Sequence, residues 1–486
     1  MTPSPLWTAA DIITAIDFND RKGDDDWAAD GISIDTRTLK AGDIFFAIPG
    51  PNFDAHAFVA QAYAKGAVAA VISRDPGTYP SDAPLLFVDD ATTALQQLAV
   101  AARNRLQGKV LAITGSVGKT GTKEMLRLCL DTQGSTAASA GNLNNHWGLP
   151  LSLCRVPADT AFTVLEIGMN HSNEILPLVK IARPHVAIVT AVEPAHTEYF
   201  ASVDEIADAK AEIFEVVVVG GAAVINRDSP YFGRLAAAAR DAGVERIIGF
   251  GHDDEADVKL VHAELTANES SVEAAIHGSI IRYRIGAPGQ HVVMNSLAVA
   301  ASVDAIGCDV QVAANALGQF VPLKGRGQHI SVQLAEGSFL LIDESYNASP
   351  ASMRAAMAVT GLMKPEPAGR RIAVLGDMLE LGDSAIQEHC ALAGPLQDNA
   401  FDLVFTSGQI TQNLWSELPE GIRGGHSISP DKLSMVITSA VRAGDVVMVK
   451  GSLGSRIGVV VDALLALDQS QVVDNQIGQQ TVINGN

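Results

Sequence analysis

Short apolar runs alternate with longer amphipathic stretches along most of the chain. Apolar runs bounded by Gly, Asn, Asp or Pro are typical of buried parallel strands, and the stretches between them have helical periodicity. From residue 106 to 322 the alternation predicts a doubly wound parallel sheet, and it resumes after residue 327. The predicted strands are 110–114, 162–167, 186–190, 222–226 and 246–250 in the first stretch, then 338–342, 371–375, 402–406 and 446–449.

Residues 1–105 have a smaller pattern, with strands at 44–48, 67–72 and 85–88 and a helix at 92–105. We therefore predict an α/β protein of three domains. These are a small mixed α/β domain (1–105), a central doubly wound parallel-sheet domain (106–322) and a Rossmann-like α/β domain (323–467). The tail, 468–486, is polar and without periodicity, and we expect it to be disordered.

Charge and cysteine usage narrow the function classes. The chain has 34 Lys and Arg against 55 Asp and Glu, a net charge of −21, which argues against a nucleic-acid partner. The four cysteines have no paired spacing, as expected of a reducing cytosol. Residues 1–20 carry no basic segment of a signal peptide, and no apolar run reaches membrane-spanning length. We expect a cytoplasmic protein without integral membrane association.

The stretch Val110–Glu124 (VLAITGSVGKTGTKE) has the order of a P-loop: apolar strand, glycine-rich turn, Lys-Thr and helix. Backbone N–H groups of such a turn and the helix N-terminus bind phosphate oxygens, the lysine reaches the β- and γ-phosphates, and the threonine ligates Mg²⁺. The general pattern wants a glycine at Ile113, so the match is partial. The alternative is a plain strand–turn–helix with a solvated lysine. The predicted phosphate-binding residues are Gly115, Ser116, Val117, Gly118, Lys119 and Thr120.

Further polar residues follow the predicted strands, where ligands of parallel sheets bind. Glu166 ends one strand and suits Mg²⁺, although a salt-bridge role fits equally well; His196 lies in a loop after the next strand, where a surface role is the common one. Asp343 follows a later strand and opens DESYNASP, in which Ser349-Pro350 suits a helix start. Lys450-Gly451-Ser452 ends the last strand in a second phosphate-friendly turn.

Lys210 occupies an unusual position. Ser202-x-x-Glu205 predicts a capped helix, and Lys210 falls on its apolar stripe with Ile206 and Ile213. Such a lysine either extends its ammonium to water or is partly buried with a lowered pKa. The residues by themselves favour extension to water.

Together these motifs resemble the Mur ligase family over nearly the whole chain. Within that family they are most similar to members that join D-alanyl-D-alanine to UDP-N-acetylmuramoyl-tripeptide. Two departures are His291-Val292, where the family usually reads His-Asn, and a displaced arginine, Arg456. The matching stretches are 34–50, TGSVGKT (114–120), 142–153, LEIGMN (165–170), EPAHTEYF (193–200), KAEIFE (210–215), IDESYNASPASM (342–353), VLGDMLELG (374–382) and VKGS (449–452).

The resemblance implies a cytoplasmic, monomeric ATP-dependent amide ligase that works through an acyl phosphate with two Mg²⁺ ions. Lys119, His196 and Lys210 would be catalytic, with Lys210 carbamylated, and Thr120, Glu166, His196 and Lys210 would hold the metals. UDP-substrate binding would fall to Asp35, Thr36, Arg37, Asn142, Asn144 and Asn145. ATP would also contact Asn295, Arg326, Asp343 and Tyr346, and the phosphate or dipeptide side would involve Asn347, Lys450 and Arg456.

Two alternatives stay open. One is a related Mur or folylpolyglutamate-type ligase with another amino acid substrate, against which DESYNASP and LGDMLELG argue. The other is a non-enzymatic nucleotide-dependent switch, which would have no need of Glu166, His196 and Lys210.

Overall fold

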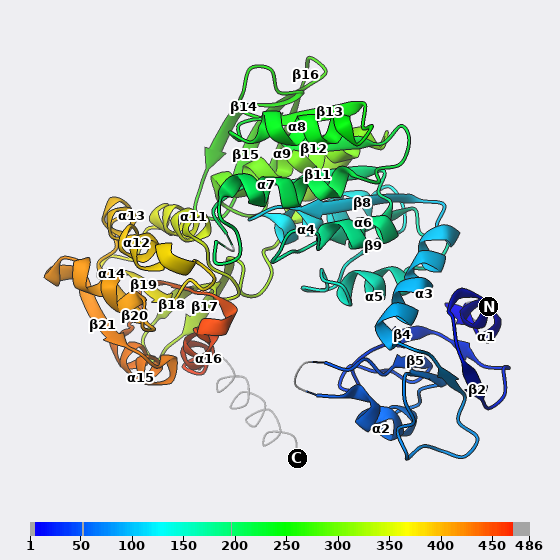
Figure 1. Ribbon diagram of the computed structural model, residues 1–486. Coiled ribbons are helices and arrows are strands. Elements are labelled where there is room, and N and C mark those ends of the chain that lie inside the picture. Colours follow the sequence, from blue (N-terminus) through cyan, green and yellow to red (C-terminus); the bar gives the residue numbers. More distant parts are fainter. Residues whose placement is uncertain (1–4, 51–52, 196, 470–486) are drawn as a thin grey trace, which may run out of the picture.

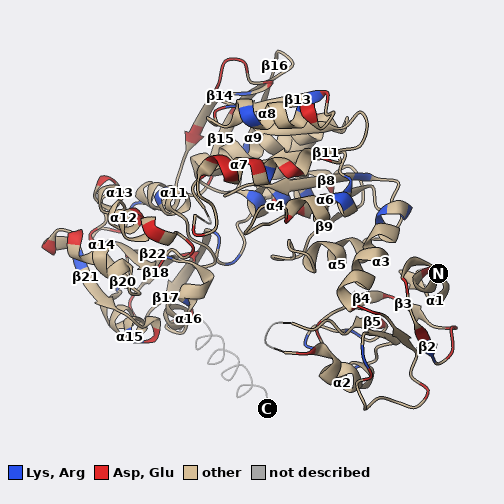
Figure 2. Ribbon diagram, viewed as in Figure 1, with Lys and Arg blue, Asp and Glu red and all other residues tan. Residues whose placement is uncertain are grey.

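The computed structural model describes residues 5–50, 53–195 and 197–469. Figure 1 shows three parts along the chain, each with its own sheet: the first at lower right, the central one at the top and the last at left. Lys and Arg are interspersed with Asp and Glu over all three parts in the view of Figure 2. Of the predicted disordered tail, all but Asp468 and Gln469 lies outside the described residues.

The first part has a five-stranded sheet in the order β2-β7-β6-β5-β4, with β4 to β7 parallel and β2 antiparallel. The sequence places three of these strands and the long helix correctly. Helix α3 packs against α5 and α6 of the central part, so the first and central parts share one apolar core. The elements are β1 (Trp7–Thr8), α1 (Ala9–Ala15), β2 (Asp20–Lys22), β3 (Ala28–Ala29), β4 (Gly31–Ser33), β5 (Asp43–Phe46), η1 (Ala55–Phe58), α2 (Val59–Ala64), β6 (Ala69–Ile72), β7 (Leu85–Phe87) and α3 (Ala91–Arg105).

The central sheet has nine strands in the order β16-β15-β14-β13-β12-β11-β8-β10-β9. All five predicted strands are present and parallel, as a buried α/β sheet requires. Its far edge differs from the expectation, because β14, β15 and β16 form an antiparallel extension. The strands are β8 (Lys109–Thr114), β9 (Thr136–Ala138), β10 (Phe162–Glu166), β11 (Val186–Val189), β12 (Ala222–Asn226), β13 (Arg246–Gly251), β14 (Val258–Leu265), β15 (Ser270–Ile276) and β16 (Ser279–Ile285).

Helices cover both faces of this sheet. Along β8, Val110 and Ala112 face one helical layer, and Leu111 and Ile113 face the other, because successive side chains alternate. This two-layer burial explains why β8 reads as an unbroken apolar run. The helices are α4 (Lys119–Leu130), α5 (Gly148–Cys154), α6 (Ile175–Ala182), α7 (Val203–Ala211), η2 (Glu212–Phe214), α8 (Phe232–Asp241), α9 (Gln290–Ala305), α10 (Val310–Ala316) and η3 (Leu317–Gln319).

The last part has a six-stranded sheet in the order β17-β18-β22-β19-β20-β21, parallel except for β17. Ser349 caps α11 and Pro350 is its first residue, as predicted. The elements are β17 (Gln328–Gln333), β18 (Ser338–Glu344), α11 (Pro350–Gly361), β19 (Arg371–Gly376), η4 (Gly382–Ser384), α12 (Ala385–Cys390), α13 (Ala393–Asp398), β20 (Leu403–Ser407), α14 (Thr411–Glu417), η5 (Glu420–Ile422), β21 (Arg423–Ser427), α15 (Pro430–Ala440), β22 (Val446–Lys450), η6 (Leu453–Ser455) and α16 (Gly458–Leu465).

Candidate active site

The glycine-rich turn lies between β8 and α4, at the carboxyl edge of the central sheet (Figure 1). Gly118 precedes α4 with φ of +87°, a left-handed conformation that favours glycine. A Cβ atom on Gly115 would lie 2.0 Å from Thr190 Oγ1, so this position has no room for a side chain. Thr190 Oγ1 donates to the Val117 carbonyl at 2.6 Å, and Ser116 Oγ donates to the Glu193 carbonyl at 2.9 Å. The segment after β11 therefore holds the turn in place.

Lys119 and Thr120 begin α4 as the motif predicts. The Lys119 ammonium is partly buried and donates to the Gly115 carbonyl at 2.5 Å, so it folds back over the turn. Burial lowers the pKa of Lys119, the Glu166 carboxylate opposes this shift, and the positive charge of Arg326 adds to it. The Lys119 ammonium and the backbone N–H groups of the turn together suit an anionic ligand.

Thr120 and Glu166 form the oxygen-rich centre of the site. Thr120 Oγ1 donates to Glu166 Oε2 at 2.9 Å, and Asn144 Nδ2 donates to Glu166 Oε1 at 2.9 Å. Among the described residues there is no group of three or more His, Cys, Asp or Glu side chains that could hold a metal ion. A hydroxyl and one carboxylate fit Mg²⁺, which takes few protein ligands and completes its shell with water and substrate phosphates.

Lys210 is buried, with 2% of its surface exposed, so the expectation that it extends to water is wrong. Ser202 Oγ caps α7 by accepting the Glu205 N–H, and the helix turns Lys210 inward. No described residue accepts a hydrogen bond from its ammonium or pairs with it. Burial, and then the like charge of Lys119, lower the pKa of Lys210 well below its ordinary value. His196, its predicted partner, lies outside the described residues.

One cleft of about 1340 Å³ joins the glycine-rich turn, Thr120 and Glu166 and reaches all three parts of the molecule, whereas Lys210 is not among the residues that line it. Its walls come from α3, the glycine-rich turn, the segment 142–146, α6, the start of α9, the linker before β17 and the loop after β18. Among the predicted residues that line it are Ser116, Val117, Gly118, Lys119, Thr120, Asn142, Asn144, Asn145, Glu166, Asn295, Arg326, Tyr346, Asn347 and Lys450. His291 and Val292, where the chain departs from the family's usual pair, line it too.

The last part contributes a cationic wall. The Arg326 guanidinium lies 4.4 Å from the Tyr346 ring centroid, a cation–π arrangement that fixes both side chains. Lys450 is buried at the end of β22, where Nζ lies 3.1 Å from Glu344 Oε2 and 3.0 Å from the Asn347 carbonyl. Both cations therefore face the cleft from fixed positions.

Asp343 differs from its expected place around the nucleotide. It is fully buried and is absent from the residues that line the cleft. Its carboxylate accepts the N–H of Gly325 at 2.9 Å and the N–H and hydroxyl of Ser345 at 3.1 and 2.6 Å. Asp343 thus holds together the two loops that carry Arg326 and Tyr346.

Other predicted residues lie away from the cleft. Asp35, Thr36 and Arg37 follow β4 in the first part, where Arg37 Nη2 lies 2.6 Å from Asp35 Oδ2 and this pairing lowers the pKa of Asp35. Arg37 is 87% exposed and can meet a ligand there. Arg456 is also exposed and lies 3.8 Å from Asp431, outside the cleft lining.

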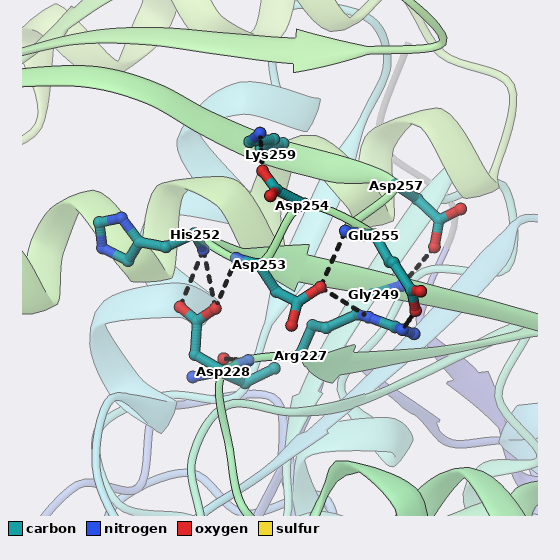
Figure 3. A network of polar contacts seen from close by, with 10 residues as sticks. Arg227, Asp228, Gly249, His252, Asp253, Asp254, Glu255, Asp257 and Lys259 are labelled. Carbon is teal, nitrogen blue, oxygen red and sulfur yellow. Dashed lines mark hydrogen bonds and ion pairs between the residues drawn. The ribbon is translucent and has the colours of Figure 1, made fainter.

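The polar residues at the end of β12 lie in two different places. Asn226 lines the cleft, whereas Arg227 and Asp228 hold the loop between β13 and β14 (Figure 3). Asp228 accepts the N–H groups of His252 and Asp253 at 2.8 and 2.9 Å, and Arg227 pairs with Asp253 and Glu255. This network is structural.

Sequence reasoning missed two groups. Glu193 lines the cleft, and burial raises its pKa, with Arg354 opposing the shift. Lys123 is fully buried on α4. The sequence did indicate that Lys123 is buried, because Lys123, Leu126 and Leu130 lie on one face of α4 at spacings of three and four.

A glycine-rich turn between a parallel strand and a helix that begins Lys-Thr defines a P-loop α/β protein. No helix within the described residues is long and apolar enough to cross a bilayer. Three family models match the chain: "Mur ligase family, catalytic domain" over residues 29–103, "Mur ligase middle domain" over 113–303 and "Mur ligase, glutamate ligase domain" over 325–453. The chain belongs to the Mur ligase family.

Relatives from several bacteria share most of its length. The UDP-N-acetylmuramoyl-tripeptide–D-alanyl-D-alanine ligase of Rickettsia prowazekii is 32% identical over 431 residues, 89% of this chain and 94% of that protein. The ligase of the same name from Bacillus subtilis is 32% identical over 442 residues, 90% and 93% of the two chains.

Solved structures agree with the fold. MurF from Acinetobacter baumannii superposes with a TM-score of 0.81 at 30% identity, covering 95% of this chain and 99% of that one. MurF ligase from Thermotoga maritima in complex with ADP gives a TM-score of 0.75 at 26% identity, covering 90% and 97%. The three-part α/β architecture is therefore that of the MurF structures.

Proposed function

We propose that the chain is an ATP-dependent ligase that joins D-alanyl-D-alanine to UDP-N-acetylmuramoyl-tripeptide and forms the pentapeptide precursor of peptidoglycan. The observation that carries the proposal is a single cleft in which the P-loop, the asparagine segment and the cationic wall of the last part meet. The names of the relatives over nearly the full chain support this choice of substrates. Because the reaction uses ATP and a nucleotide-linked substrate, we place it in the cytoplasm. We further propose that the protein is a monomer with three domains, 1–105, 106–322 and 323–467.

The proposed chemistry follows from charge. The γ-phosphoryl group of ATP passes to the terminal carboxylate of the tripeptide, which forms an acyl phosphate and ADP. The dipeptide amine then attacks the acyl carbon, the C–O bond to phosphate breaks, and an amide and inorganic phosphate result. Two anions must meet in the first step, so Lys119 would turn from the Gly115 carbonyl to the transferring phosphate.

The substrates would lie in a fixed order, with the UDP end extending beyond the cleft onto the first part. Arg37 with Asp35 and Thr36 would hold the UDP end, and Asn142, Asn144 and Asn145 the muramoyl-peptide. Arg326, Tyr346 and Asn295 would surround ATP, with Asn347 and Lys450 on the phosphate or dipeptide side. The acyl phosphate hydrolyses readily, so movement of the three domains around the substrates would exclude water.

Two Mg²⁺ ions would neutralise the phosphates and the carboxylate with their charge. Thr120 and Glu166 would hold the first. We propose that Lys210 carries a carbamate, formed when its neutral amine attacks CO₂ and releases a proton, and that this carbamate and His196 hold the second. The burial of Lys210 without a described partner supports this, because a carbamate turns a costly ammonium into an oxygen ligand.

A coupling assay tests the function. The purified chain is given ATP, Mg²⁺ and UDP-N-acetylmuramoyl-tripeptides that differ in the third residue, with D-Ala-D-Ala, D-Glu or L-Ala as the amine, and phosphate and amide products are measured together. We expect phosphate release to require D-Ala-D-Ala. Substrate-independent ATP turnover, or coupling of a single amino acid in its place, would overturn the proposal.

Lys119→Ala is the matched variant for this assay. Loss of the cation that meets the transferring charge should lower ligation by about 10²–10³-fold or more while the fold is kept. Near-normal phosphate release coupled to amide formation would contradict the P-loop assignment.

A further inference from the structure

Lys123 is a fully buried lysine that the proposed chemistry does not use. It lies on α4 one turn beyond Lys119 and Thr120, and none of its surface is exposed. Lysine is almost never fully buried unless it is paired. The environment of its ammonium should therefore show what it does.

Two backbone carbonyls accept hydrogen bonds from the Lys123 ammonium, and two carboxylates, a near one and a distant one, lie at ion-pair distance. Nζ donates to the Ser139 carbonyl at 2.7 Å and to the Gly141 carbonyl at 3.3 Å. It also lies 3.1 Å from Glu124 Oε1. An ammonium has three protons, so these three oxygens match its donors. The Glu166 carboxylate lies further away, with Oε2 at 3.9 Å.

The two carbonyls belong to the segment that leads from β9 to the cleft. Its asparagines, Asn142, Asn144 and Asn145, line the cleft, whereas Lys123 itself does not. The segment has other ties to β10, because the Gly168 N–H donates to the Asn144 carbonyl at 2.9 Å and Asn144 Nδ2 to Glu166. Lys123 is the tie from this segment to the phosphate-binding helix.

We propose that Lys123 is a positioning residue that anchors segment 139–145 to α4 and so sets the asparagine side chains for the muramoyl-peptide substrate. The inference rests on the proposed function for the identity of that substrate. Lys123 does not contact the cleft, so its loss should weaken binding of the UDP-linked substrate while the phosphate-binding turn remains formed.

The test measures two affinities of the Lys123→Met variant by titration calorimetry in the presence of Mg²⁺, with one ligand added at a time. We expect the Kd for UDP-N-acetylmuramoyl-tripeptide to rise by about tenfold or more, the value of one charged hydrogen bond, and the Kd for ATP to change by less than about threefold. Lys180→Met, an exposed lysine on α6, is the matched control and should bind both ligands as the wild type does. Equal affinities of Lys123→Met and wild type for the UDP substrate would overturn the inference. A wild type that fails to bind that substrate would overturn the proposed function instead.

A double variant separates anchoring from charge balance. If the defect came from the negative charge of Glu124, which would keep only Arg127 as its partner, Lys123→Met combined with Glu124→Gln would restore binding. If Lys123 acts by anchoring the two carbonyls, the double variant should bind the UDP-linked substrate about tenfold more weakly than Glu124→Gln alone. Equal affinities of the double variant and Glu124→Gln would refute the anchoring role.

Hydrogen exchange on the wild type provides a measurement that needs no variant to fold. The amides of residues 139–145 should exchange together with those of α4, far more slowly than exposed amides. Exchange of this segment at the rate of an open loop would count against the anchor even if Lys123→Met cannot be purified.

Discussion

Lys210→Met is the substitution that separates stability from activity in this fold most clearly. Methionine has a similar length and no charge, and the position is 2% exposed on the inner side of α7. No described residue pairs with the ammonium, and Lys119 contributes a like charge nearby. The native lysine is therefore unfavourable for folding, and its presence needs a functional reason.

The expected gain can be worked out from the type of site. Replacement of a buried ion pair by apolar side chains of similar volume is often neutral or stabilising by about 1–4 kcal/mol, and the Lys210 ammonium has no described carboxylate to offset its burial, so Lys210→Met should gain at least as much. The pH dependence gives a second measure. Because the pKa of Lys210 is lowered in the folded chain, the unfolded chain binds one more proton between that pKa and about 10.4, the ordinary value. Stability should therefore rise with pH in this window by about 1.4 kcal/mol per unit, and Lys210→Met should remove that slope.

Activity should move the opposite way. Loss of the carbamate oxygens should reduce ligation by about 10²–10³-fold, as loss of a preorganised charge partner does. Lys210→Arg should fail to restore it, because a guanidinium keeps its positive charge and forms no carbamate. Acetate or propionate added to Lys210→Ala should recover part of the rate by occupying the vacated oxygen positions.

The assay combines denaturant unfolding of the ligand-free chain in CO₂-free buffer with the ligation assay. Carbon-13 spectra of wild type in ¹³CO₂ should show one carbamate signal that Lys210→Met lacks. Full activity of Lys210→Arg, or absence of that signal with full wild-type activity, would refute the two-metal arrangement.

Two further substitutions probe other parts of the molecule. Arg37→Ala should weaken binding of the UDP-linked substrate by about 10-fold or more through loss of charged hydrogen bonds, while ATP affinity and stability stay the same, because Arg37 is 87% exposed in the first part; an equal loss for both nucleotides would indicate misfolding. His185→Gln keeps an acceptor for the Val110 N–H, which His185 Nδ1 accepts at 2.9 Å. Burial, with Arg103 and Lys109, lowers the pKa of His185 to about 4, so the unfolded chain binds the extra proton between pH 4 and about 6.5 and stability falls as pH falls through that window. Unfolding titrations from pH 4 to 7 should show a shallower slope for His185→Gln, and an unchanged slope would assign the acid sensitivity to other groups.

The parallel strands could be predicted from sequence because each is buried on both faces. Such strands appear in the sequence as short apolar runs. The glycine-rich turn after β8 is recognisable because few other structures require that local sequence. The antiparallel extension was missed. β15 and β16 meet at His277-Gly278, two residues with positive φ, and β15 alternates buried and partly exposed positions. The first strand of that hairpin shows the period of two, but its turn lacks the familiar Asn-Gly pair.

Side-chain burial was harder to predict than the strands. Whether Lys210 reaches water depends on elements packed over α7, and whether Asp343 meets the nucleotide depends on loops at Gly325 and Ser345 that fold onto it. Neither packing is encoded within one helix or strand. A lysine on an apolar stripe therefore has two outcomes that only the tertiary structure decides.

The charge of the cleft makes the site depend on more than its own cations. Within the described lining, the cations are Lys119, Arg326 and Lys450, and the carboxylates are Glu124, Glu166, Glu174, Glu193, Glu344 and Glu380. Lys450 already pairs with Glu344, so two cations remain to face a nucleoside triphosphate and a carboxylate substrate. A cleft of this sign in a chain of net charge −21 repels both substrates until divalent cations are bound. The acidic lining therefore links substrate affinity to metal binding, and it explains why a buried lysine would serve the reaction better as an anionic carbamate ligand than as a third free cation.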